Sequence, residues 1–140
     1  MNRPETSIGV LSFEIAGLWF GIRLNLIEGV SPLGEVVTVP GGTPQAFVGL
    51  TYLMGHLMVV IDMGFVSLRA MPASKDVVIF KQGNEYFAIK IGRVGSVLSA
   101  TQTVKEKNEF DEILECVVEE KGMKVHVIEV SQLVQRHVCR

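Results

Sequence analysis

Short apolar segments of strand length, separated by turn residues, recur along the whole chain. Between residues 11 and 15, three apolar residues alternate with Ser12 and Glu14, which is the period of two typical of a strand with one buried face. The longest apolar run, residues 57–61, has the length of one buried strand. Because the segments are short and closely spaced, the pattern predicts an all-β fold rather than a layered α/β fold.

The expected strands number about nine or ten and are joined by short turns. They cover residues 11–15, 18–23, 35–39, 49–53, 57–61, 76–81, 85–91, 94–99, 113–119 and 123–129. A helical turn is predicted at 24–30, a short helix begins at Thr43-Pro44, and Ser131 caps a C-terminal helix. The glycine-containing turn at 54–56 suits a tight hairpin, because glycine adopts positive φ without strain.

No repeat, low-complexity segment or linker divides the 140 residues. A chain of this length buries roughly two-thirds of the surface that its unfolded state exposes, so one compact fold is expected. We predict a single domain over residues 1–140, with a crossover between two sub-barrels near residues 70–76.

The composition narrows the range of partners and compartments. Hydrophobic residues make up 48% of the chain, charged residues 20%, and the formal net charge is −2. The lysines and arginines are dispersed rather than gathered into a stripe that would neutralise a phosphate backbone, so nucleic acid is not an expected partner. The first residues are polar, and no segment has the ~20 apolar residues of a membrane span. We therefore expect a cytoplasmic protein that does not insert into a membrane.

Candidate catalytic groups are isolated from one another in the sequence. His56 lies in a turn, His126 on the polar face of a strand and His137 near the C-terminus, without the spacing of metal ligands or a serine elbow. Cys116 is predicted among apolar strand neighbours, where a thiol behaves as a small hydrophobe. Acidic residues between 106 and 120 alternate with lysines, as in a solvated segment. The sequence therefore predicts no enzyme activity, no metal site and no cofactor.

Trp19 and Arg23 are unusual residues for a strand surface. They fall on the outer face of the predicted strand 18–23, while Phe20 and Ile22 point to the other face. Tryptophan and arginine are enriched among the residues that dominate binding energy at protein interfaces. Both are therefore candidate partner-binding residues.

Residues 39–63 read VPGGTPQAFVGLTYLMGHLMVVIDM, with a proline turn followed by two apolar strands around one tight turn. This order is similar to that of the chemotaxis coupling protein (CheW) family, in which the first strand ends in Asn-Leu-Arg-Gly and the second in Asp-Leu. The matching positions are Pro40, Phe47, Gly49, Leu53, Gly55 and Asp62. Further similarity at residues 20–27, 87–98 and 125–133 extends the resemblance over nearly the whole chain.

The resemblance implies a fold of two small intertwined five-stranded barrels with short helices and no active site. Members of the family couple methyl-accepting chemoreceptors to the histidine kinase CheA, whose regulatory domain has the same fold. The cytoplasmic receptor tips lie in the groove between the sub-barrels, and the kinase contacts use barrel ends. By position, Ile27, Gly49 and Val97 match places that the family uses for partner contact.

Two positions depart from the family pattern together. Met54 replaces the arginine of Asn-Leu-Arg-Gly, and Gly29 replaces the glutamate that commonly pairs with it. Loss of one partner would leave a charge without its counter-ion, whereas loss of both leaves no unpaired charge. Gly29, Leu53, Met54 and Gly55 are therefore candidate contacts on a surface more apolar than is usual in the family.

The sequence thus predicts a non-catalytic adaptor that binds a CheA-like kinase regulatory domain, a chemoreceptor tip, or both. One alternative is a divergent member that has lost kinase or receptor coupling and assembles with itself or another CheW-like protein, serving a pilus or other regulatory pathway. A small-ligand-binding barrel or enzyme is a further alternative, which requires a polar cavity with convergent titratable groups.

Overall fold

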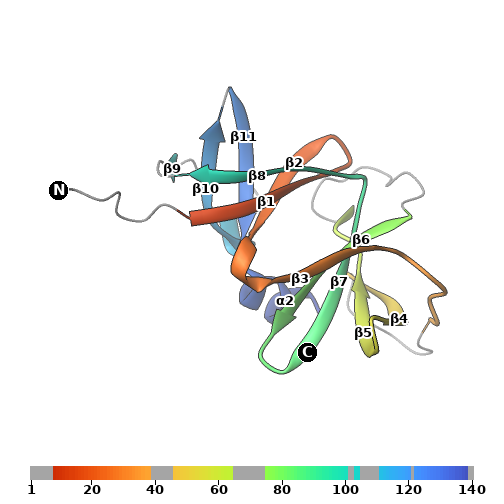
Figure 1. The fold of residues 1–140 in the computed structure, drawn as a ribbon. Coiled ribbons are helices and arrows are strands. Elements are labelled where there is room, and N and C mark those ends of the chain that lie inside the picture. The colour runs from red at the N-terminus through yellow and green to blue at the C-terminus, as the bar shows by residue number, and fades with distance from the viewer. Residues whose placement is uncertain are drawn as a thin grey trace.

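Two β-sheets and a short C-terminal helix make up the described part of the chain (Figure 1). The computed structural model describes residues 8–38, 46–64, 75–100, 103–104, 111–120 and 122–138. The first sheet has six strands in the order β8-β1-β2-β11-β10-β9. They are β1 (Ile8–Ile15), β2 (Leu18–Arg23), β8 (Arg93–Ala100), β9 (Thr103–Val104), β10 (Leu114–Glu120) and β11 (Met123–Ile128).

The second sheet has five strands in the order β3-β6-β7-β5-β4. They are β3 (Ile27–Pro32), β4 (Phe47–Leu53), β5 (His56–Ile61), β6 (Asp76–Gln82) and β7 (Glu85–Ile91). Neighbouring strands are antiparallel except for the pairs β2–β11 and β5–β7, which are parallel. The β2–β11 pair joins an early hairpin to a late one, so the first sheet depends on contacts between residues far apart in the sequence.

Described residues carry the chain from one sheet to the other at two places. The 3-10 helix η1 (Leu24–Leu26) leads from β2 into β3, and Gly92 separates β7 from β8. The crossover expected near residues 70–76 falls mostly outside the described residues, and the strands on either side of it, β5 and β6, belong to the same sheet. That expectation therefore misplaced the passage between the sheets. A turn-rich composition marks a connection but does not say which sheet the next strand joins.

The turn at Met54-Gly55 confirms the hairpin expected there. Met54 has φ 52° and Gly55 φ 80°, and a two-residue turn with positive φ at both positions matches the right-handed twist of the strands it joins. The first hairpin turns in the same way at Ala16-Gly17, with φ 52° and 87°. Only glycine adopts this region without strain, so Met54 and Ala16 are held there by the strand pairing on either side.

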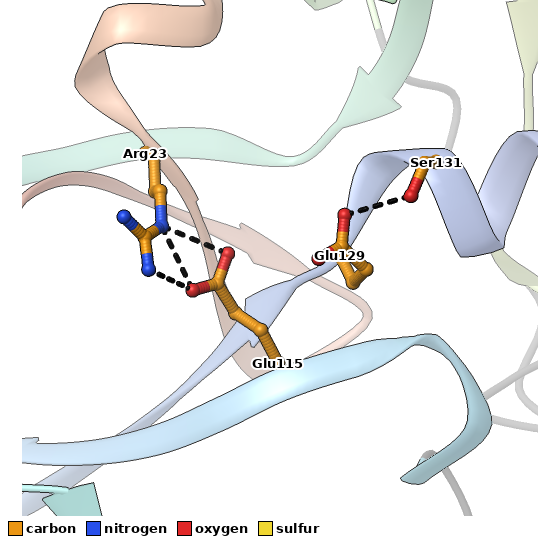
Figure 2. A network of polar contacts seen from close by, with 4 residues as sticks. All are labelled: Arg23, Glu115, Glu129 and Ser131. Carbon is orange, nitrogen blue, oxygen red and sulfur yellow. Dashed lines mark hydrogen bonds and ion pairs between the residues drawn. The ribbon is translucent and has the colours of Figure 1, made fainter.

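The helices are short and differ in detail from the expected ones. The helix η1 covers part of the helical turn predicted at 24–30, and η2 (Asp111–Ile113) precedes β10. Helix α2 (Val130–His137) begins two residues earlier than a Ser131 cap would allow, and its N-cap is Glu129. The Ser131 hydroxyl instead donates a hydrogen bond of 2.9 Å to the Glu129 carboxylate (Figure 2). The helix expected at Thr43-Pro44 lies outside the described residues.

Burial of Val130 explains why α2 starts early, since this residue packs in the main core. The buried residues of the helix lie on the face that covers this core, and they are Val130, Leu133 and Val134. No helix in the described ranges is long and apolar enough to cross a membrane.

The largest core cluster combines residues of both sheets and α2. Its members from β1 and β2 are Leu11, Phe13, Ile15, Phe20 and Ile22, and those from β6 and β7 are Val78, Phe80, Phe87, Ile89 and Ile91. A smaller cluster around Val10, Val125 and Val127 belongs to the first sheet, and another around Met58 and Ile79 belongs to the second. Strands such as β6 are therefore buried on both faces, which accounts for their continuous apolar runs.

The all-β class, the two strand units and the C-terminal helix are confirmed. The first sheet has one strand more than expected because the short β9 pairs with β10. The hydrogen-bonded ladders end at β8 and β9 in one sheet and at β3 and β4 in the other, so the described strands form open sheets rather than closed barrels. The stretch predicted as a strand at 35–39 makes an isolated bridge between Val37 and Leu50.

Candidate functional site: protein-binding surfaces

The apolar face of the first sheet continues beyond the main core onto its edge strand, β8. Side chains directly opposite one another on neighbouring strands project to the same face. Val97 lies opposite Leu11 of β1, and Val94 lies opposite Phe13. Leu11 and Phe13 are core residues, whereas Val97 is 58% exposed and Val94 is also exposed. We call Val94 and Val97 the β8 surface.

The edge strand β3 of the second sheet likewise carries an exposed apolar side chain opposite a core residue. Val30 lies opposite the core residue Val78 and is exposed, while Ile27 lies opposite Phe80 and is partly buried against the core. Ile27 is therefore a core-flanking residue with limited access to a partner. The more accessible side chain on this strand is Val30.

A second exposed apolar surface covers the hairpin of β4 and β5 at the opposite edge of the five-stranded sheet. Leu50 lies between Val59 and Val37 in one row of opposed residues, and Tyr52 lies opposite Leu57 in the next row. Tyr52 is 67% exposed, Leu57 65% and Val37 62%. With Glu35 and Thr51 they line an open depression of about 470 Å³. We call Val37, Leu50, Tyr52 and Leu57 the hairpin surface.

This hairpin surface is the part of the site that the sequence did not reveal. The period of two around the 54–55 turn places Tyr52 and Leu57 on one face, but a period does not say whether that face is covered. Along the same face, Val59 and Ile61 pack against the main core, and the exposed residues lie nearer the turn. Whether this face of the hairpin is buried depends on how far the other sheet extends over it, and that is set by the whole fold.

Gly49 is buried beneath the segment that carries Val37. A Cβ atom at Gly49 would lie 2.4 Å from the carbonyl oxygen of Val37 and 2.9 Å from the Val36 side chain. The main-chain groups of Val37 and Leu50 exchange two hydrogen bonds of 2.8 Å directly beside this position. The sequence suggested that Gly49 contacts a partner. In the structure, the missing side chain of Gly49 also lets the segment at Val37 pack against β4 and complete the hairpin surface.

Met54 and Gly29 lie close together, as their joint departure from the family pattern suggested. The sulfur and the terminal methyl of Met54 both lie 3.5 Å from the place where a Cβ atom of Gly29 would be. The tip of the β4–β5 hairpin therefore reaches edge strand β3 through a thioether contact instead of an ion pair. Gly55 beside it is exposed, while Leu53 is partly buried against the small core of the second sheet.

Arg23 forms an ion pair with Glu115 that links β2 to β10 (Figure 2). The guanidinium Nε donates to both carboxylate oxygens at 2.8 and 3.0 Å, and Nη2 donates to Oε1 at 2.6 Å. These hydrogen bonds, opposed by desolvation and assisted by the charge of Glu115, raise the pKa of Arg23 above its ordinary value. Arg23 therefore has a partner within the chain before any other protein binds.

We expect the Arg23–Glu115 pair to contribute about 1 kcal/mol of coupling energy to folding. Exposed ion pairs contribute less, but this pair is bidentate and the Glu115 side chain is only 16% exposed. A double-mutant cycle of Arg23→Gln and Glu115→Gln, measured by urea unfolding, gives the value. A coupling energy near zero would mean that the stabilising role is wrong and that Arg23 is free to act at a surface.

Trp19 is half-buried rather than free on the outer face. Its ring packs against the small core of the first sheet and fills the space beside Gly95, where a Cβ atom would lie 2.5 Å from the indole. The Arg93 guanidinium lies 5.3 Å from the ring centre, within the range of a cation–π contact. Arg93 also pairs with Glu14 at 2.9 Å.

Groups that could support acid–base or nucleophilic chemistry are not gathered into one site within the described ranges. Burial raises the pKa of the Cys116 thiol, which disfavours the reactive thiolate. The Nδ1 atom of His126 lies 3.0 Å from the Trp19 carbonyl oxygen, so this histidine has a structural contact. No group of three or more histidine, cysteine, aspartate or glutamate residues suited to a metal occurs in the part of the chain that the structure describes.

Comparison with known proteins relates this architecture to a scaffolding protein. No model of a protein family matches the sequence, and no curated protein matches it. The crystal structure of scaffolding protein TtCheW from Thermoanaerobacter tengcongensis is similar, with a TM-score of 0.74 at 14% sequence identity. The match covers 88% of this chain and 89% of that chain. The chain therefore has the CheW fold, as the resemblance in sequence predicted.

Proposed function

We propose that the protein is a non-catalytic adaptor that holds a CheA-like histidine kinase and the cytoplasmic tip of a chemoreceptor in one complex. The observation that carries this proposal is the pair of separate apolar surfaces, one on β8 and one on the β4–β5 hairpin, which extend the face of the shared core. Exposed apolar residues gathered on a rigid sheet are typical of protein-binding sites. Two such surfaces suit a protein that binds two partners together.

The arrangement of the sheets suggests which partner binds where. The β8 surface continues the core shared by the two sheets, so we assign it to the receptor tip, which the family binds between its two units. The hairpin surface lies at the far edge of the second sheet, and we assign it to the kinase regulatory domain, which the family binds at barrel ends. The adaptor acts by position, because it favours the kinase conformation that its contacts fit best.

A three-component binding experiment tests the proposal. The cognate kinase regulatory domain and a soluble receptor-tip fragment are each titrated into the protein by calorimetry, and the second partner is then added to the first complex. We expect dissociation constants at or below the micromolar range and a ternary complex. Absence of binding of either partner at about 100 μM would overturn the adaptor proposal. A defined oligomer by light scattering, without partner binding, would instead support the self-assembling alternative.

Met54 and Gly29 lie outside both named surfaces, and restoring the family's charge pair there tests whether this contact also contributes to receptor affinity. A Cβ atom at Gly29 meets only the flexible end of Met54, at ordinary contact distance, so Met54→Arg with Gly29→Glu should fold. We expect the double variant to bind a receptor tip of the usual family type at least about tenfold more tightly, a gain of about 1.4 kcal/mol. Each single variant is the matched control, since it carries an unpaired charge and should bind no better than the parent chain.

A further inference from the structure

Three residues of soft or borderline ligand character occupy alternate positions at the tip of the β4–β5 hairpin. Met54, His56 and Met58 line one small pocket of about 70 Å³, together with Glu28, Ile79 and Tyr86. His56 and Met58 lie two residues apart on β5, and side chains at this spacing project to the same face of a strand. Met54 reaches the same pocket from the turn, where it lies over Gly29.

The surroundings of each side chain differ in a way that suits a binding site. Met58 is 2% exposed and packs in the small core of the second sheet, so its thioether is desolvated. Met54 is more than half exposed and lies at the mouth of the pocket. The His56 ring stacks on Tyr86 with 4.0 Å between ring centres and 27° between ring planes. His56 is exposed to solvent, and its imidazole nitrogens have no hydrogen-bond partner among the described residues.

Packing accounts for the position of each methionine taken alone. It does not account for why Met54, His56 and Met58 line the same pocket. Met58 fills a core, and Met54 covers a glycine. The His56 imidazole and the two thioethers line the same pocket, whose volume of about 70 Å³ leaves room for a small ligand. Tyr86 acts here as a positioning residue, because its ring fixes the plane of the imidazole.

We propose that Met54, His56 and Met58 bind a soft monovalent metal ion, Cu(I), through two thioether sulfurs and one imidazole nitrogen. Thioether ligands select Cu(I), and imidazole suits copper as well. The Glu28 carboxylate at the same pocket supplies negative charge near the ion. Mg²⁺ and Ca²⁺ require several oxygen ligands, and this pocket offers one carboxylate, so it discriminates against them. No residue of the β8 or hairpin surface supplies a ligand. Met54 is shared with the charge-pair position of the proposed function, so the metal titration is carried out on the protein without a receptor tip.

Titration with Ag(I), a redox-stable stand-in for Cu(I), tests the site. The full chain carries Cys116→Ala and Cys139→Ser, so that no thiol competes for the metal, and methionine methyl and histidine ring signals are followed by NMR. We expect one equivalent of Ag(I) to shift the signals of Met54, His56 and Met58 together while the Met123 methyl stays in place. Cu(I), kept reduced with ascorbate under nitrogen, should compete for the same equivalent.

Conservative variants separate a ligand set from ordinary packing. Met54→Leu and Met58→Leu conserve side-chain volume, and His56→Phe keeps a ring against Tyr86 without a nitrogen. Since loss even of a ligand's supporting residue weakens metal sites about 10–100-fold, each variant should lose at least about tenfold in Ag(I) affinity. Met123→Leu is the matched control and should bind as the parent does. Unchanged affinity in the Met58 or His56 variant, with thermal unfolding confirming the fold, or a shift of Met54 alone, would overturn the proposal.

Discussion

Leu57→Asp should weaken kinase binding strongly while leaving receptor binding intact. Leu57 is 65% exposed in the hairpin surface, so an aspartate there is solvated in the free protein and costs little stability. In the complex the same carboxylate would be buried against an apolar partner without a counter-ion. We expect a loss of at least about 2 kcal/mol, or about 30-fold in the dissociation constant, measured by calorimetry with the kinase regulatory domain.

Val97→Asp is the matched control for this experiment, because it introduces the same charge at a residue of similar exposure on the β8 surface. It should weaken receptor binding by a similar factor and leave kinase binding unchanged. If both variants weaken the same partner, the assignment of one surface to each partner is wrong. If neither variant affects either partner, the two apolar surfaces are not the binding sites.

Local features of the fold could be predicted from the sequence because their causes are local. The period of two over residues 11–15 gave the strand, and the glycine at position 55 gave the hairpin turn. The passage between the sheets was misplaced because it depends on which strands pair. The parallel pairing of β2 with β11 and of β5 with β7 joins segments that no local pattern connects.

The same limit applies to the candidate site. Trp19 and Arg23 were correctly placed on the face of β2 opposite Phe20 and Ile22, but their neighbours come from distant strands. Glu115, on β10, pairs with Arg23, and Gly95, on β8, admits the Trp19 ring. A sequence pattern can assign a residue to a face, whereas the partner that covers it is set by tertiary pairing. The joint change at positions 29 and 54 was more informative than the face of a strand. Both members of a charge pair are replaced there, and this predicted that the two residues lie in contact.

Gly49→Ala should destabilise the protein rather than simply remove a contact. The new methyl would lie 2.4 Å from the Val37 carbonyl oxygen, which is backbone and cannot rotate away. The segment at Val37 must move or the β4 strand must shift, and such overpacking costs about 1–3 kcal/mol. Thermal unfolding should show a fall in Tm of about 5 °C or more. Gly34→Ala is the control, since a Cβ atom there meets nothing within 4 Å and should leave stability equal or slightly higher.

The binding behaviour of this variant distinguishes two roles for Gly49. If the glycine serves to seat Val37, Gly49→Ala should weaken kinase binding only to the extent that the hairpin surface is disturbed, and Val37→Ser should weaken it without lowering Tm. If Gly49 instead touches the partner directly, Gly49→Ala should weaken binding with Tm unchanged. Burial of Gly49 beneath Val36 and Val37 favours the first outcome, because a partner would meet those side chains before it reached the glycine.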